Sequence, residues 1–129
     1  MADVNRGNRP LSPFMLGQYY RFQLNSFTSI LTRITGNAML LAALMIVWWF
    51  VAAAAGPEAF ETADWFVTSF IGDLIMFFSM LGLWYHLLAG IRHLIWDNAM
   101  MLDVKTADFL GLLCLIIAPL LTIFTVIVI

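Results

Sequence analysis

The chain has 129 residues, of which 63% are hydrophobic and 11% charged, and its formal net charge at pH 7 is -2. A mean hydropathy of +0.93 excludes a soluble globular domain and indicates one compact membrane bundle. Since the charges lie at the ends of apolar runs, we expect no nucleic-acid partner. The single cysteine, Cys114, excludes an intramolecular disulfide and is expected to be a small packing residue.

Residues 1–25 are expected to form an N-terminal arm at the cytoplasmic surface and the membrane interface. The segment Arg9-Pro10-Leu11-Ser12-Pro13 cannot be a helix interior, because each proline lacks a backbone N–H. From Phe14 to Leu24 aromatic and polar residues alternate, which suits the membrane–water interface. Asn25 or Ser26 is expected to cap the helix that follows.

Residues 26–129 are expected to form a single transmembrane domain of three helices. The predicted spans cover about residues 30–55, 65–96 and 109–129. The stretch from Thr35 to Ala55 is uncharged and has about the 20 residues needed to cross about 30 Å of hydrocarbon. Gly56-Pro57-Glu58 should end the first span, and Pro119 is expected to kink the third. The predicted fold class is therefore an all-α membrane protein.

The basic residues predict the orientation of this bundle. All six lie on one side of the predicted spans, and they are Arg6, Arg9, Arg21, Arg33, Arg92 and Lys105. The opposite connection, Gly56 to Asp64, is acidic and contains no basic residue. The positive-inside rule then places the N-terminus in the cytoplasm and the C-terminus in the periplasm of a bacterial inner membrane.

Both histidines lie near the end of the second predicted span. His86, Gly90 and His93 are spaced i, i+4, i+7 and share one helix face. An intramembrane histidine one turn from a glycine suggests a metal-bearing flat ligand against the helix. A histidine hydrogen-bonded to a neighbouring helix is the other interpretation.

The two histidines cannot hold one metal ion from opposite sides. Opposed axial nitrogens lie about 4 Å apart, whereas seven helical residues rise about 10.5 Å. A second axial ligand to a metal at His86 would have to come from another chain.

A second polar cluster opens the first span. Ser29, Arg33 and Gly36 also share one helix face. The arginine either extends to lipid phosphates or lines a buried anion or carbonyl site together with the serine. Since both clusters fall in the predicted cytoplasmic half, we expect them to form one site.

Three blocks of the sequence resemble one family, the cytochrome b subunit (the C subunit, or larger membrane anchor) of succinate dehydrogenase, respiratory complex II. They are Arg9 to Pro13, Ser29 to Gly36, and His86 to Asp97, the last with the family form H-x-x-x-G-x-R-H-x-x-x-D. The third block is specific, and the resemblance spans the whole chain.

The resemblance implies half of a haem-binding anchor bundle. His86 would be an axial ligand of haem b, with the other ligand from a second small anchor subunit. Gly90 and His93 would adjoin the haem, Arg33 would approach its propionates, and Ser29 and Arg33 would line a ubiquinone site. The chain would have no activity alone, and would dock an iron–sulfur subunit and a flavoprotein that oxidises succinate.

The sequence departs from the family pattern twice. Phe14 and Thr32 stand where many members have a histidine. The departure at Thr32 affects any propionate contact or proton relay that the family would form from that position. It does not affect the axial ligand.

Two alternatives remain open at this stage. One is a haem-free or menaquinone-linked anchor of the fumarate reductase type. The other is a small transporter subunit, for which Asp73 is the candidate intramembrane carboxylate. Asp73 would otherwise hydrogen-bond to a neighbouring helix near the interface.

Overall fold

The computed structural model describes residues 22–129. They form four helices and no strand: α2 (Leu24–Ala55), α3 (Pro57–Val67), α4 (Phe70–Asp97) and α5 (Val104–Val128). By length and composition α2, α4 and α5 can each cross a membrane. This confirms the predicted all-α membrane class. The expectations for the arm, including Arg6, Arg9 and Phe14, lie outside the described residues.

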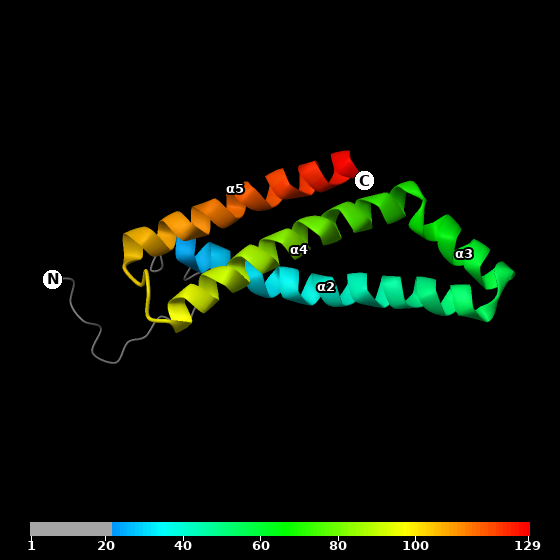
Figure 1. The fold of residues 1–129 in the computed structure, drawn as a ribbon, viewed down its shortest axis with the longest axis horizontal. Coiled ribbons are helices and arrows are strands. Elements are labelled where there is room, and N and C mark those ends of the chain that lie inside the picture. The colour runs from blue at the N-terminus through cyan, green and yellow to red at the C-terminus, as the bar shows by residue number, and fades with distance from the viewer. Residues whose placement is uncertain (1–21) are drawn as a thin grey trace, which may run out of the picture.

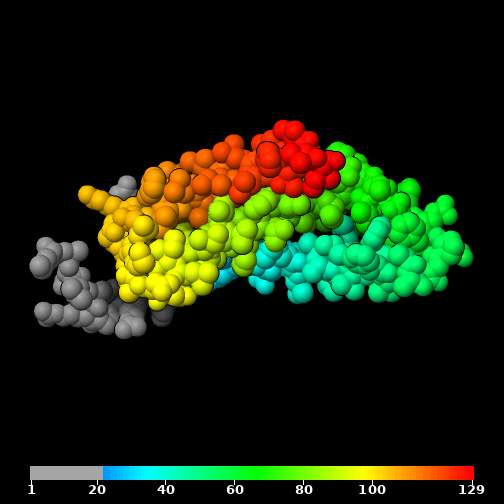
Figure 2. Space-filling view, in the orientation of Figure 1, coloured from blue at the N-terminus to red at the C-terminus, as the bar shows by residue number. Residues whose placement is uncertain are grey.

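The three long helices lie side by side with alternating direction, and each packs against the other two (Figure 1). The start of α2 and the α4–α5 connection lie at one end of the bundle, and α3 lies at the other. We call these the basic end, which carries Arg33, Arg92 and Lys105, and the acidic end, which carries Glu58 and Glu61. In the space-filling view α4 and α5 are in contact along the bundle (Figure 2).

The second predicted span begins later than expected. Residues 65–96 were expected to form one helix, but the chain turns at Thr68 and Ser69 between α3 and α4. Thr68 Oγ1 donates to the Asp64 carbonyl at 2.7 Å, and the Ser69 hydroxyl accepts from the Gly72 N–H at 3.2 Å. A hydroxyl that satisfies a first-turn N–H is a helix N-cap, so Ser69 starts a new helix.

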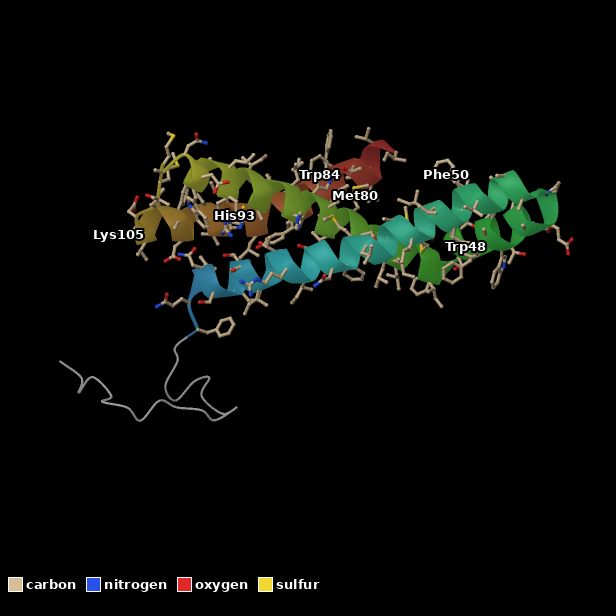
Figure 3. The ribbon with its side chains drawn as sticks, turned by 90° about the horizontal axis from the view of Figure 1, so that it is seen from below. Trp48, Phe50, Met80, Trp84, His93 and Lys105 are labelled. Carbon is tan, nitrogen blue, oxygen red and sulfur yellow. The ribbon has the colours of Figure 1, made fainter. Side chains whose placement is uncertain are left out.

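The short helix α3 packs against the last turns of α2 through aromatic rings. Trp48 meets Phe66 edge-to-face with centroids 5.7 Å apart, and Trp49 meets Phe60 at 5.2 Å. Trp49 Nε1 also donates to Asp64 Oδ1 at 3.3 Å. The predicted acidic connection is therefore a helix held by an aromatic cluster. Trp48 lies at the opposite end from His93 and Lys105 (Figure 3).

Helix α5 begins five residues before the predicted Phe109, because Asp103 caps it. Asp103 Oδ2 accepts from the Thr106 N–H at 2.9 Å and from the Thr106 hydroxyl at 2.8 Å. These hydrogen bonds hold the pKa of the Asp103 carboxyl below its usual value. The cap is therefore intact above the ordinary aspartate pKa and is lost as the pH falls through the lowered one. α5 continues through Pro119.

Small residues fill the contact between helices. Tyr85 and Ala89 of α4 are buried against Cys114 and Ala118 of α5. Close approach of helices through small residues is the usual mode of packing within a membrane. The buried Cys114 confirms its prediction as a packing residue. The large apolar side chains mostly face outward, toward the lipid and any partner subunits.

We predict that Gly72→Ala destabilises the bundle. A Cβ at Gly72 would collide with the carbonyl oxygens of Val67 and Phe66, and overpacking of this kind costs about 1–3 kcal/mol. The thermal unfolding temperature of the purified membrane complex should fall. Gly82→Ala is the control, since its Cβ would lie 3.9 Å from the Thr35 side chain, an ordinary contact. Equal unfolding temperatures for the two variants would contradict the prediction.

Candidate functional site

A row of threonines on α2 forms the surface that meets α4. Thr28, Thr32 and Thr35 share one face, and each hydroxyl donates to a carbonyl one turn earlier on α2, at 3.2, 2.8 and 2.9 Å. Because their protons are used within α2, this face meets α4 with acceptors, which are the Thr28 hydroxyl and the carbonyl oxygens of Thr28 and Thr32. Tyr85 and His86 of α4 supply donors to this surface.

The hydrogen bonds of His86 define its tautomer. His86 Nδ1 lies 3.2 Å from the Thr32 carbonyl oxygen and 3.4 Å from Thr35 Oγ1. A carbonyl can only accept, so we assign the proton to Nδ1. Nε2 then keeps its lone pair, and it has no hydrogen-bond partner among residues 22–129. A backbone carbonyl that orients a ring in this way is the usual outer support of a metal-ligating histidine.

Gly36 makes room for the imidazole. A Cβ at this position would lie 3.0 Å from His86 Cε1, closer than an unstrained contact allows. The half-buried ring therefore lies close against α2, with Cε1 nearest to Gly36. Both interpretations of His86 given by the sequence are compatible with this contact, because Nδ1 bonds the neighbouring helix while Nε2 stays available.

Gly36 also brings the two predicted clusters together. It shares a face with Ser29 and Arg33, and it touches His86 on α4. The two clusters therefore lie on the same side of the α2–α4 pair. Ser29 is half-buried and Arg33 exposed, and neither makes a hydrogen bond or ion pair with another described residue. Their polar groups are free to meet a ligand or a partner subunit.

The other predicted members of the site lie on the open side of α4. A Cβ added at Gly90 would meet no atom within 4 Å in the described chain, so the helix surface beside His86 is uncovered. His93 is exposed, with its ring edge-to-face on Trp96 at a centroid distance of 5.2 Å. It lies toward the basic end (Figure 3).

The sequence interpretation used Arg92 only as one of the basic residues that orient the bundle, and it missed the role of this side chain inside the protein. Its side chain is 2% exposed, its Nη1 donates to Thr28 Oγ1 at 3.0 Å, and its guanidinium lies over the Trp96 ring at 4.7 Å. The available signal was spacing, because Tyr85, Ala89 and Arg92 (i, i+4, i+7) share the buried face of α4.

Four buried polar atoms toward the basic end have no hydrogen-bond partner within the described chain. They are Asn25 Oδ1, Arg92 Nε, Trp96 Nε1 and Asp108 Oδ1. Two are donors and two are acceptors, and they come from all three long helices. Buried polar groups are rarely left unpaired, and water or partner groups usually complete them.

Asp73 lies apart from this site. It is exposed in the first turn of α4, where a carboxylate is favoured by the helix dipole. Its carboxylate makes no hydrogen bond to another described residue, so the predicted bond to a neighbouring helix is not formed within residues 22–129.

The described residues cannot hold a bare metal ion by themselves. No group of three or more His, Cys, Asp or Glu side chains comes together within residues 22–129. A metal ion at His86 would need its remaining ligands from elsewhere, such as a macrocycle and a second chain. The observation that fits a haem, which brings four nitrogens of its own, is the single imidazole whose Nε2 is unbonded within these residues.

The fold is that of a membrane protein with three helices long and apolar enough to cross a bilayer, and its second long helix carries one half-buried imidazole with an unbonded Nε2. The sequence profile of the succinate dehydrogenase/fumarate reductase transmembrane subunits matches residues 5–128. The chain belongs to this family, as one of its succinate dehydrogenase cytochrome b subunits.

Curated relatives agree over most of the chain. The succinate dehydrogenase cytochrome b556 subunit of Paracoccus denitrificans is 52% identical over 107 residues, which are 83% of this chain and 81% of the relative. The cytochrome b560 subunit of Reclinomonas americana is 32% identical over 120 residues, covering 89% and 82%. The cytochrome b560 subunit of Chondrus crispus is 31% identical over 125 residues, covering 91% and 93%. The transporter alternative is therefore wrong.

Proposed function

We propose that this chain is the haem-ligating membrane anchor of a succinate:ubiquinone oxidoreductase. It binds haem b through His86 together with a second small anchor subunit, and it contributes Ser29 and Arg33 to a ubiquinone site. It docks the iron–sulfur subunit and the flavoprotein, and has no catalytic activity alone. The observation that carries this proposal is the orientation of His86. Its Nδ1 donates to the Thr32 carbonyl, which leaves the lone pair of Nε2 free to bind a metal.

Several residues of this chain would hold the haem. His86 supplies the axial nitrogen, and the uncovered surface at Gly90 lets a flat ring approach α4. Arg33 supplies a cation for a propionate, and His93 lies one turn beyond Gly90 on the same face. When bound, the haem supplies a one-electron carrier. Thr32 and Thr35 keep the imidazole from rotating, which preserves the direction of Nε2.

Ser29 and Arg33 suit a ubiquinone carbonyl. The hydroxyl can donate to a neutral quinone oxygen, and the guanidinium can stabilise the negative charge that develops when that oxygen is reduced. Both lie on the side of α2 that meets His86 through Gly36. Partner subunits would close the remaining walls, because Arg33 is exposed in this chain.

The basic end is proposed to face the cytoplasm of a bacterial inner membrane. All described basic residues lie toward this end, and the acidic residues of α3 lie at the other. Soluble subunits that oxidise succinate in the cytoplasm would then dock beside the quinone site, so electrons would cross a short distance. A haem-free or menaquinone-linked fumarate reductase anchor is the alternative, and the cytochrome b names of the relatives favour the haem-bearing form.

Labelling of single cysteines tests this orientation. A cysteine at Glu61 in α3 should react with a membrane-impermeant maleimide from the periplasm, and one at Met100 should react from the cytoplasm. Both positions are exposed, whereas the native Cys114 is buried and should stay unlabelled. The reverse labelling pattern would place the site on the wrong face for a cytoplasmic succinate oxidase.

We expect His86→Ala to abolish the low-spin b-type spectrum of the purified complex while the anchor stays inserted. The variant removes the axial nitrogen, and no other described histidine lies within reach, since His93 is about 10.5 Å further along α4. His93→Gln is the matched control and should retain the low-spin spectrum. An unchanged spectrum in the His86→Ala complex would rule out the assignment.

Ser29→Ala and Arg33→Leu should impair quinone reduction while succinate oxidation with a water-soluble acceptor persists. A hydrogen bond to a neutral oxygen is worth about 0.5–1.5 kcal/mol and one to a charged oxygen about 1.5–3 kcal/mol. Arg33→Leu should thus reduce quinone turnover about tenfold more than Ser29→Ala. If both activities fell in parallel, the two residues would be structural and would not bind quinone.

A further inference from the structure

We propose that Arg92 and Tyr85 are positioning residues that act through Thr28, setting the rotation of α2 and with it the direction of Ser29 and Arg33. The inference rests on the proposed quinone role of that pair. Neither Arg92 nor Tyr85 lies on the open side of α4, so neither is proposed to touch the quinone. The contacts of Thr28 carry the argument.

All three membrane helices converge on Thr28, which is completely buried. Tyr85 Oη donates to its carbonyl oxygen at 2.8 Å, and Arg92 Nη1 donates to its Oγ1 at 3.0 Å. From α5, a Cβ at Gly111 would lie 3.1 Å from Arg92 Nη1 and 3.2 Å from Thr28 Cγ2. The absence of a side chain at Gly111 therefore leaves the space in which the guanidinium reaches α2.

A buried arginine in a membrane bundle has a large desolvation cost, so it is retained where its hydrogen bonds have a structural or functional role. No acidic side chain within residues 22–129 forms an ion pair with Arg92, whose side-chain partners there are the Thr28 hydroxyl and the Trp96 ring. The charge is directed at one hydroxyl of the neighbouring helix. Bulk apolar packing alone would not need a charged group there.

Two groups of contacts, at Thr28 and at Thr32, fix the rotation of α2 about its own axis. Tyr85 and Arg92 hold Thr28, and His86 holds the Thr32 carbonyl at 3.2 Å. Ser29 directly follows Thr28, and Arg33 directly follows Thr32. Without the Arg92 bond, Tyr85 at the Thr28 carbonyl and His86 at Thr32 and Thr35 are the remaining hydrogen bonds between α2 and α4 in the described chain. With side chains about 5–6 Å from the helix axis, a rotation of about 20° moves them by about 2 Å, which is enough to break a hydrogen bond.

The test is a pair of matched threonine variants in the complete complex. Thr28→Val removes the acceptor for Arg92, together with the hydroxyl's own bond to the Asn25 carbonyl. Thr125→Val is the control on α5: its hydroxyl accepts from Trp84 Nε1 at 3.1 Å and donates to the Leu121 carbonyl at 2.7 Å. Both variants remove one interhelical and one local hydrogen bond, but the control lies between α4 and α5, away from Ser29.

We expect Thr28→Val to raise the KM for a short-chain ubiquinone about three- to tenfold, the effect of one weakened hydrogen bond. Succinate oxidation with a water-soluble acceptor and the low-spin haem spectrum should not change, because His86 keeps its own bonds. Tyr85→Phe should shift KM in the same direction, and Thr28→Ser should restore it by returning the hydroxyl. Thr125→Val should lower thermal stability and leave KM unchanged.

Equal KM values for the Thr28→Val and Thr125→Val complexes would overturn the inference, as would a Thr28→Ser complex with the KM of Thr28→Val. If Thr28→Val does not assemble, Tyr85→Phe and Thr28→Ser decide the question. Ser29→Ala measured in parallel separates the two proposals. A raised KM in Ser29→Ala without one in Thr28→Val refutes the positioning inference alone, whereas an unchanged KM in Ser29→Ala refutes the quinone role and the inference with it.

Discussion

The site depends on one antiparallel contact, in which adjacent residues of α4 each donate to a backbone carbonyl of α2. Tyr85 bonds the Thr28 oxygen at 2.8 Å, and His86 bonds the Thr32 oxygen at 3.2 Å. The Thr28 carbonyl also accepts the Thr32 hydroxyl at 2.8 Å, and the Thr32 carbonyl accepts the Thr35 hydroxyl at 3.1 Å, so each oxygen is shared between a donor of α2 and a donor of α4. In lipid, where water cannot compete, such bonds hold helices in a defined register. The same contact sets the tautomer of the imidazole and the rotation of the helix that carries Ser29 and Arg33.

Glycines permit this contact where any larger residue would disturb it. Gly36 lets the imidazole lie against α2, and Gly111 lets the Arg92 guanidinium pass α5. At the other end, Gly72 lets the start of α4 approach the last carbonyls of α3. The approaches at Gly36 and Gly111 bring polar side chains into the bundle, whereas the large apolar side chains mostly face outward. That outer surface suits a subunit that works beside lipid and partner chains.

Arg33 and Arg92 both lie toward the basic end, but the structure gives them different roles. Arg33 is exposed and makes no bond within the described chain, as a group directed to a ligand or a partner would be. Arg92 is buried and bound to Thr28, so it acts within the chain. The two arginines differ because Arg33 lies beside the α2–α4 contact and Arg92 lies in it.

The sequence alone determined the class and the number of long apolar helices, but not where they begin: α2 starts at Leu24, before the expected cap at Asn25 or Ser26, and Gln23 precedes it without a side-chain cap. Long uncharged runs can only cross a membrane as helices, and the spacing of His86, Gly90 and His93 defines one face in any helix. The block from His86 to Asp97 was specific enough to indicate the family, which the comparisons confirmed. The packing role of Cys114 was also predictable, because a lone cysteine in an apolar run has few other uses.

The tertiary structure decided what depends on a neighbouring helix. Hydropathy could not show the turn at Thr68 and Ser69, because local hydroxyl bonds end α3 while the apolar run continues. Nor could it show that Arg92 is buried, since an arginine near a helix end normally extends to the interface. That residue turns inward because Thr28 offers an acceptor and Gly111 leaves space. Those two residues come from other helices, and periodicity within one helix carries no information about which partner faces it.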